Sequence, residues 1–290
     1  MLYFYLWVFA HAAGAATISL LILKPLKQML RRAGAVRVNF RQREVINMAG
    51  ILIVFVWMLL MALVAVFPAL IKAIDINLPN GFVLSLNVAM PLTAIIIGAG
   101  LFGLIDDLLG NRESTGFKGH IGELIKGRLT TGGLKAIGIT SVALLAAAFL
   151  SNNIFEIIGN AALIALFVNT VNLLDLRPGR ALKFYIPLQL LLAIAGIKTL
   201  GTSSAALLGI ALVMIGPDLK EEVMLGDTGS NILGGVLGFC LAAIFEWNIK
   251  LPVIILLLVL QLLTEKFSIS EVIERTPALR AIDNFGRRVD

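Results

Sequence analysis

The chain has 290 residues, of which 59% are hydrophobic and only 14% are charged, and its mean hydropathy is +0.94. A soluble domain could not expose so apolar a surface, so the protein must use lipid as its solvent. A single Cys excludes a disulfide framework and a Cys/His zinc site. The net charge of +6 comes from basic residues that border apolar segments, which indicates membrane topology and not nucleic-acid binding.

Nine apolar runs free of Lys, Arg, Asp and Glu predict an all-α fold, a polytopic membrane helix bundle of about nine to ten transmembrane helices. We expect one integral membrane domain over residues 1–290, with a turn at 201–203. The first run lacks a basic start and a cleavage site, so it is expected to remain as a membrane helix. In chain order the runs are Leu2–Leu23, Val45–Ile71, Val83–Ile105, Ala136–Leu150, Ile157–Val171, Phe184–Ile197, Ser203–Ile215, Asn231–Phe245 and Leu251–Leu263.

The basic residues predict the orientation of the bundle. If the nine runs alternate sides, 21 of the 24 Lys and Arg residues fall on one side, and only Lys72, Lys198 and Lys250 fall on the other. Basic loops stay in the cytoplasm. The sequence therefore predicts an outside N-terminus, a cytoplasmic C-terminus with an amphipathic tail over residues 265–290, and a multi-pass protein of the inner (plasma) membrane.

Two adjacent carboxylates, Asp106 and Asp107, directly follow some 20 uncharged residues. A carboxylate at membrane depth costs roughly 2.5 to 3.5 kcal/mol on insertion scales, so the pair needs compensation, which a divalent cation would provide. The alternative is that both simply end a helix in water.

A second polar cluster repeats every third residue, at Asn169, Asn172 and Asp175. This spacing predicts one helix face on which the amides orient a sugar or phosphate while Asp175 meets a metal or a base. Hydrogen bonds between helices are the alternative, because Asn often supplies them inside bundles.

A third cluster, from Leu225 to Asn231, places Asp227 between glycines at the start of an apolar run. Exposed backbone N–H groups at a helix start bind anions, and a carboxylate there can hold the cation that bridges them. A plain capping loop would look the same. The hypothesis gains weight because all three clusters fall on one membrane side.

A Gly-rich basic segment lies between the first two clusters, at 116–133. Its Lys118, Lys126 and Arg128 could bind phosphate oxygens, and His120 could shuttle a proton. Structural roles and contacts with anionic lipid headgroups are the alternatives. Lys118 and His120 are the preferred candidates for a catalytic role.

At these residues the sequence resembles the polyprenyl-phosphate hexosamine-1-phosphate transferase family, of the glycosyltransferase family 4 type. That family includes the phospho-MurNAc-pentapeptide translocase and the GlcNAc-1-phosphate transferases. The three Asp-bearing clusters occur in the family's order, and residues 39–50 are similar to its first cytoplasmic loop, so the resemblance covers about positions 39 to 235.

The resemblance implies an all-helical enzyme that transfers a sugar 1-phosphate from a nucleotide sugar, UDP in that family, to a polyprenyl phosphate. Mg²⁺ (or Mn²⁺) would be the cofactor, and the product would start a cell-envelope glycan lipid intermediate. Asp106 and Asp107 would be the paired catalytic acids, Asp227 with Asp106 the metal ligands, and Asn172 with Asp175 the donor-site pair. The sequence leaves self-association as a homodimer open.

Two departures distinguish this chain from the family. Asp175 is followed by Leu-Arg177-Pro178-Gly-Arg180 where the family has Gly-Leu-Asp-Gly, and the tail from Glu265 has no His-rich motif. The hypothesis is that Arg177 and Arg180 move recognition toward anionic groups of the donor or the lipid, with lipid anchoring as the alternative. A noncatalytic member that binds a polyprenyl-phosphate carrier is the second reading of the whole chain, and a transporter is the third.

Overall fold

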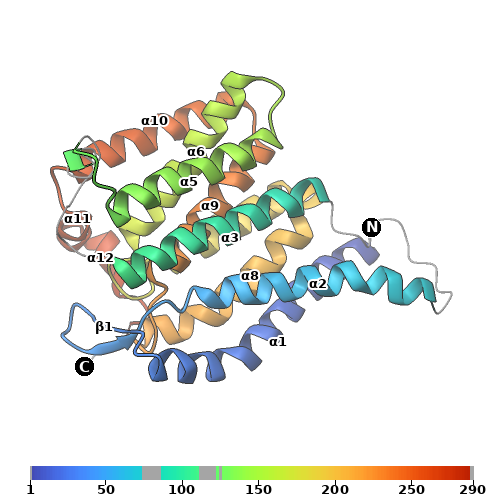
Figure 1. Ribbon diagram of the computed structural model, residues 1–290, viewed down its shortest axis with the longest axis horizontal. Coiled ribbons are helices and arrows are strands. Elements are labelled where there is room, and N and C mark those ends of the chain that lie inside the picture. The colour runs from blue at the N-terminus through green and yellow to red at the C-terminus, as the bar shows by residue number, and fades with distance from the viewer. Residues whose placement is uncertain (1, 74–85, 111–121, 124–125, 288–290) are drawn as a thin grey trace.

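The computed structural model describes residues 2–73, 86–110, 122–123 and 126–287, and helices account for most of them (Figure 1). The helices lie side by side and share one buried apolar core. Their bounds are α1 (Leu2–Arg32), α2 (Ile51–Ala73), α3 (Leu86–Leu109), α5 (Thr131–Ala148), α6 (Ile154–Leu174), α7 (Arg180–Ala195), α8 (Ile197–Leu219), α9 (Gly226–Ile244), α10 (Trp247–Thr264), α11 (Ile269–Arg275) and α12 (Pro277–Asn284).

Seven of the described helices are long and apolar enough to cross a membrane, and α2 contributes a shorter apolar stretch, Ile51–Val66. Many large apolar side chains lie on the outside of the bundle, as lipid-facing surfaces require. The chain is therefore a multi-pass membrane protein with an all-α bundle. Each of the nine apolar runs has a helical counterpart, and most of these helices extend past the run by several residues.

The first helix extends well past its apolar run, which ended at Leu23. It continues through Pro25 and five charged or polar positions to Arg32. The apolar run therefore predicted only the part of the helix that lies in lipid. The basic residues after Leu23 remain helical outside the lipid, where their charges are solvated. The two arginines at its end, Arg31 and Arg32, also suit the negative end of the helix dipole.

The prediction of helix from Val45 onward is wrong over its first residues. Two antiparallel strands, β1 (Val36–Val38) and β2 (Glu44–Ile46), form a hairpin, and α2 begins only at Ile51. The backbone between them bonds to the chain before α9: Met224 N donates to Ile46 O at 2.7 Å and Gly50 N donates to Leu225 O at 3.0 Å. Contacts distant in sequence thus override the local apolar pattern.

The turn expected at 201–203 is also misplaced, because those residues lie inside α8. The break falls at Gly196, which ends α7 and directly precedes α8. The Gly196 carbonyl accepts from the backbone N–H groups of Thr199 and Leu200 at 3.0 and 2.8 Å, so α8 starts directly after the break. The Thr199 hydroxyl adds a bond of 3.1 Å to the same carbonyl.

Helix α9 lies at the centre of the bundle, and nearly all of its residues are buried. It crosses α6 at close range through Gly234 and Gly238, where an added Cβ would lie 2.5 Å from Phe167 O and 2.6 Å from Ile164 Cα. Glycines four residues apart let membrane helices approach closely. This crossing fixes the start of α9 against the end of α6, where two of the polar clusters lie.

Candidate functional site

The three polar clusters predicted from the sequence meet at one end of the bundle. The last turn of α3 carries Asp106 and Asp107, the first turn of α9 carries Asp227, and the last turn of α6 carries Asn172. Direct contacts join all three helix ends. We call this region the site end of the bundle.

Asp107 is buried and accepts hydrogen bonds from α9. Backbone N–H groups of Asp227 and Thr228 donate to it at 3.1 and 2.9 Å, and the Thr228 hydroxyl donates at 2.8 Å. The Asn47 amide adds a bond of 3.1 Å from the first loop. No side chain at the N-cap of α9 caps that helix, so Asp107 satisfies its free N–H groups from α3.

Two glycines make this contact sterically feasible. Gly226 has φ +70°, and a Cβ there would lie 2.6 Å from Asp107 Oδ2. Gly103 lies one turn before the carboxylate pair, and a Cβ on it would be 2.4 Å from the Asp227 carbonyl oxygen. Gly226 is required by both its left-handed backbone and this close approach, and Gly103, which is helical, is required by the close approach alone.

Asp106 and Asp227 share one ammonium group. Lys135 Nζ lies 3.3 Å from Asp106 Oδ2 and 3.0 Å from Asp227 Oδ1. Lys135 is in the first turns of α5, which begins where Thr130 Oγ1 accepts from Gly133 N at 3.0 Å. The three side chains are 14% to 23% exposed, so small solutes can reach them.

These two carboxylates fit a magnesium site only together with a substrate. Within the described residues, no three His, Cys, Asp or Glu side chains form a group that could hold a metal ion. Mg²⁺ is, however, commonly held by one or two carboxylates plus substrate phosphates, and Asp106 with Asp227 offers such oxygens. Without phosphates, Lys135 supplies the compensating positive charge.

The two Asn residues of the second cluster have different partners. Asn172 Oδ1 accepts from the Ser230 hydroxyl at 3.1 Å, which joins it to the first turn of α9. Asn169 instead donates to Gln261 of α10, and Gln261 donates to the Thr170 hydroxyl at 3.0 Å. Both bonds run between helices, so the interhelical alternative describes both residues. They differ in place, because only the partner of Asn172 lies in the first turn of α9, beside Asp227.

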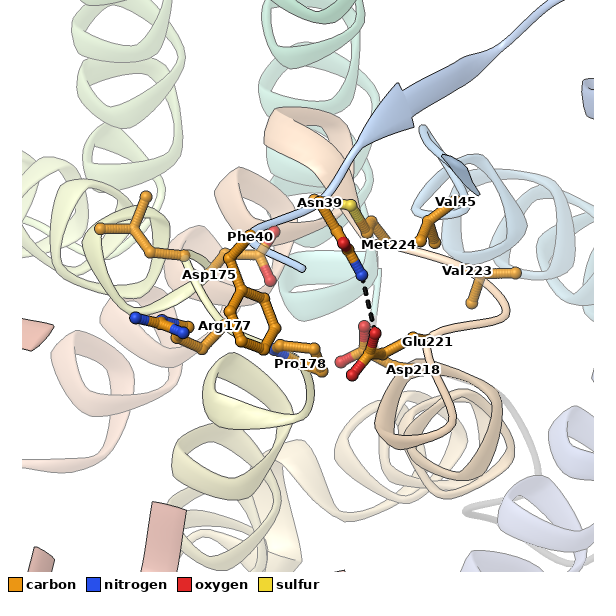
Figure 2. Close-up of a pocket in the computed structure, with 11 residues that line it drawn as sticks. Asn39, Phe40, Val45, Asp175, Arg177, Pro178, Asp218, Glu221, Val223 and Met224 are labelled. Atoms are coloured by element: carbon orange, nitrogen blue, oxygen red, sulfur yellow. Dashed lines mark hydrogen bonds between the residues drawn. The ribbon is translucent and has the colours of Figure 1, made fainter. Parts of the chain in front are cut away.

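Asp175 follows α6 and lines a small cavity together with Phe40, Pro178 and Asp218 (Figure 2). The cavity volume is about 30 Å³, which is room for about one or two water molecules and not for a nucleotide. Burial raises the pKa of Asp175 well above its usual range, and the charges of Asp218, Asp227 and Asp107 raise it further. A protonated Asp175 can donate a hydrogen bond as well as accept one.

The two arginines after Asp175 both contact the C-terminal tail. Arg180 is buried, and its Nε and one terminal nitrogen each donate to the Asp283 carboxylate at 2.9 Å. Arg177 lies 3.1 Å from Glu274 and stacks over Phe40 at 4.1 Å from the ring centroid. Both arginines therefore have protein partners where the sequence suggested substrate anions.

The basic segment is described only in part. Lys118 and His120, the preferred catalytic candidates there, lie outside the described residues. Lys126 is exposed and forms an ion pair of 2.8 Å with Glu123, and Arg128 lies 3.8 Å from the same carboxylate. These positions neither support nor contradict the expected contacts with phosphate.

Sequence reasoning missed Lys135, Asn47 and Asp283. Lys135 had a signal, since it is the one ionisable side chain within the apolar helix Thr131–Ala148. Such a residue is a functional candidate by default. Asn47 and Asp283 gave no such signal, because their partners are about 60 and 103 residues away along the chain.

Comparison with known proteins adds no assignment. No protein-family model matches the chain, and no curated protein matches it.

Proposed function

We propose that the protein is a phosphoglycosyl transferase that moves a sugar 1-phosphate from a nucleotide sugar to a polyprenyl phosphate. The observation that supports this most is the group formed by Asp106, Asp227 and Lys135, in which three different helices bring two carboxylates and one ammonium together at the site end. Reactions between two phosphate groups need this mixture of charges, since both reactants are anionic.

In the proposed reaction, a phosphate oxygen of the lipid attacks the sugar-linked phosphorus of the nucleotide sugar. The bond from that phosphorus to the bridging pyrophosphate oxygen breaks, and the nucleoside monophosphate leaves with the electron pair. Asp106 and Asp227 would hold Mg²⁺, which neutralises charge on the pyrophosphate when bound. Lys135, which lies on α5, would stabilise negative charge on the reacting phosphates. Asp107 positions Asp227 by accepting hydrogen bonds from the first N–H groups of α9.

Asn172 and Asp175 complete the proposed site on the donor side. Asn172 is held by Ser230 one turn from Asp227, and Asp175 lies at the cavity beyond it. An uncharged Asp175 suits contact with a polar donor group without adding a fourth negative charge. Because the cavity is small, a nucleotide sugar would occupy the open surface beside it and not its interior.

We place the site end on the cytoplasmic face of the plasma membrane, where nucleotide sugars are made, with the N-terminus outside. The support is the distribution of basic residues. In intact cells, an impermeant thiol reagent should label a cysteine introduced at Asn152 and not one introduced at Ser268, both in a Cys240→Ala chain. The reverse pattern would contradict this orientation.

The test of the activity is incubation of purified protein with polyprenyl phosphate and a panel of nucleotide sugars. A lipid-linked pyrophosphoryl sugar should form with Mg²⁺ or Mn²⁺ and be absent with EDTA. Asp227→Asn should abolish it, whereas Glu222→Gln should not, because Glu222 pairs with Lys27 at the surface. Turnover that survives both EDTA and Asp227→Asn would refute the proposed metal site.

A noncatalytic protein that binds a polyprenyl-phosphate carrier is the second candidate. The observation in its favour is that Lys135, Arg177 and Arg180 all form ion pairs with carboxylates of the protein. Their positive charges are therefore neutralised without any phosphate of a substrate. In that case polyprenyl phosphate should bind, while no nucleotide sugar in the panel yields a product.

A further inference from the structure

The C-terminal tail is held on the bundle by polar contacts. Asp283 is buried and accepts from Arg180, and also from Arg287 at 2.6 Å. Lys183 Nζ donates to the Asp283 carbonyl at 2.6 Å, and Arg287 Nε donates to the Pro178 carbonyl at 2.9 Å. These bonds fix α12 along one side, so the directions of its other side chains are fixed too.

Large apolar side chains of the tail nevertheless remain outside the core. The most exposed is Phe285, at 79%. In a helix, Leu279 and Ile282 share a face, with Ala278 beside them, while Asp283 turns toward the bundle and Asn284 lies opposite the apolar face. Exposed large apolar residues of the tail are Phe267, Val272, Leu279, Ile282 and Phe285. A set of this size on a fixed segment indicates an interaction surface.

The position of the tail in the chain identifies the partner. Helix α10 crosses the membrane and ends at Thr264, and its outward side chains Leu262 and Leu263 are exposed, as lipid-facing side chains are. Phe267 continues this exposed series only four residues later. The tail therefore starts at the level where the hydrocarbon ends, and Figure 1 shows α11 and α12 at the same end of the bundle as the end of α3.

Its charges agree with this location. Glu274 and Asp283 are bound to Arg177 and Arg180, and Glu271 pairs with Arg275. In the part of the tail that the structure describes, Lys266 and Arg280 form no ion pair, and Glu265 alone offsets them. A small positive excess beside an apolar face suits a membrane surface that contains anionic lipids.

We propose that residues 266–285 form an interfacial anchor that lies on the membrane surface at the site end of the bundle. Its apolar face enters the headgroup region, and its Asp283 side holds the segment 177–183 that follows Asp175. The bilayer surface is thus one of the supports of the site. This inference does not depend on the proposed reaction.

The test uses the full chain in nanodiscs of phosphatidylcholine with phosphatidylglycerol. Spin labels are attached to single cysteines at Ile282, Phe285 or Asn284 in a Cys240→Ala background. Labels at Ile282 and Phe285 should collide readily with oxygen and lose most collisions with a water-soluble nickel complex, because lipid admits the first and excludes the second. The adjacent control at Asn284 should show the opposite preference.

Two results would overturn the proposal. Nickel collisions at Ile282 and Phe285 as frequent as at Asn284 would place the apolar face in water. Loss of both oxygen and nickel collisions, relieved by dilution with unlabelled protein, would mean that a second copy of the chain covers it. Replacing phosphatidylglycerol by phosphatidylcholine should weaken nickel exclusion in the wild-type charge background and have less effect in Arg280→Gln.

Discussion

At the scale of single residues, the two adjacent carboxylates of α3 have different tasks. Asp107 is 7% exposed and its oxygens are filled by three donors from α9 and one from Asn47. Asp106 instead faces Lys135 and remains partly accessible. Each task follows from the side of the helix on which the residue lies. Asp107 supports the architecture, and Asp106 is available to a ligand.

Lys135 should prove to be the counter-charge of the two facing carboxylates. We expect Lys135→Met to lower the thermal stability of the detergent-solubilised protein in EDTA, because Asp106 and Asp227 would then repel each other. The loss should be about 1 to 3 kcal/mol, less than for a fully buried pair. Mg²⁺ should recover part of the loss, whereas Lys135→Arg should retain stability without the ion. A Lys135→Met protein as stable as wild type in EDTA would contradict this role.

Asp175 should make stability fall as pH rises. Its pKa in the folded protein is raised, so the folded state holds a proton that the unfolded chain loses above about pH 4. Its contribution is present below that pH and is lost as pH rises through the folded pKa. Asn resembles the protonated form of Asp but does not titrate, so Asp175→Asn should not lose stability at this position as pH rises.

The measurement for Asp175 is the difference in melting temperature between wild type and Asp175→Asn across a pH series. The variant should gain on wild type as pH rises from about 5 to about 9. Using the difference cancels the titration of other groups. A constant difference, or one that favours wild type at high pH, would show that Asp175 is ionised in the folded protein.

At the scale of elements, close contacts of α9 hold the site together. Gly234 and Gly238 bring it onto α6, Gly103 brings α3 onto its first turn, and Gly229 meets Gly50 at the start of α2. Each contact involves backbone atoms that cannot move independently of their helix. The start of α9 is therefore positioned by three helices at once, and the site is built on rigid elements.

Gly238→Ala should destabilise the bundle. The added methyl would lie 2.6 Å from Ile164 Cα, so the two helices must separate. We expect a cost of about 1 to 3 kcal/mol in thermal or SDS-induced unfolding. Gly14→Ala in α1 is the matched control, since an added Cβ there meets nothing within 4 Å. Equal effects of the two substitutions would contradict the close α6–α9 crossing.

The docked tail should depend on the charge of Asp283. Burial opposes ionisation of this group, but hydrogen bonds and charges from Arg180 and Arg287 outweigh it and lower its pKa. Docking is thus stabilised above the ordinary Asp pKa of about 3.9 and is lost as pH falls through the lower folded value. Removing one partner of such a buried pair costs about 3 kcal/mol or more.

Limited proteolysis of the full chain at neutral pH measures this docking. Asp283→Asn should speed cleavage within the tail by at least about a hundredfold, the factor that corresponds to this free energy. Glu271→Gln is the control, because Glu271 forms only an exposed pair of 3.9 Å with Arg275 within α11. Equal cleavage of wild type and Asp283→Asn would show that the Arg180 pair does not hold the tail.

At the scale of the whole molecule, the sequence predicted the helices because apolar runs of membrane length have few alternative structures. It also predicted that the three Asp clusters fall at one end of the bundle. Consecutive membrane helices run in opposite directions, so counting the helices between two clusters tells whether they lie on the same side. The sequence could not predict the hairpin formed by β1 and β2, the hydrogen bonds that α9 donates to Asp107, or the docking of Asp283. These depend on partners distant in sequence, whose pairing no local pattern specifies.

The most direct test of the proposed function follows the two phosphates of the donor separately. Purified protein with polyprenyl phosphate and Mg²⁺ is given a nucleotide sugar labelled in either the sugar-linked or the nucleoside-linked phosphate. Phosphoglycosyl transfer predicts that the sugar-linked label enters the lipid and the nucleoside-linked label appears in nucleoside monophosphate. Release of both labels together as nucleoside diphosphate, or no label in lipid with any donor, would contradict the account.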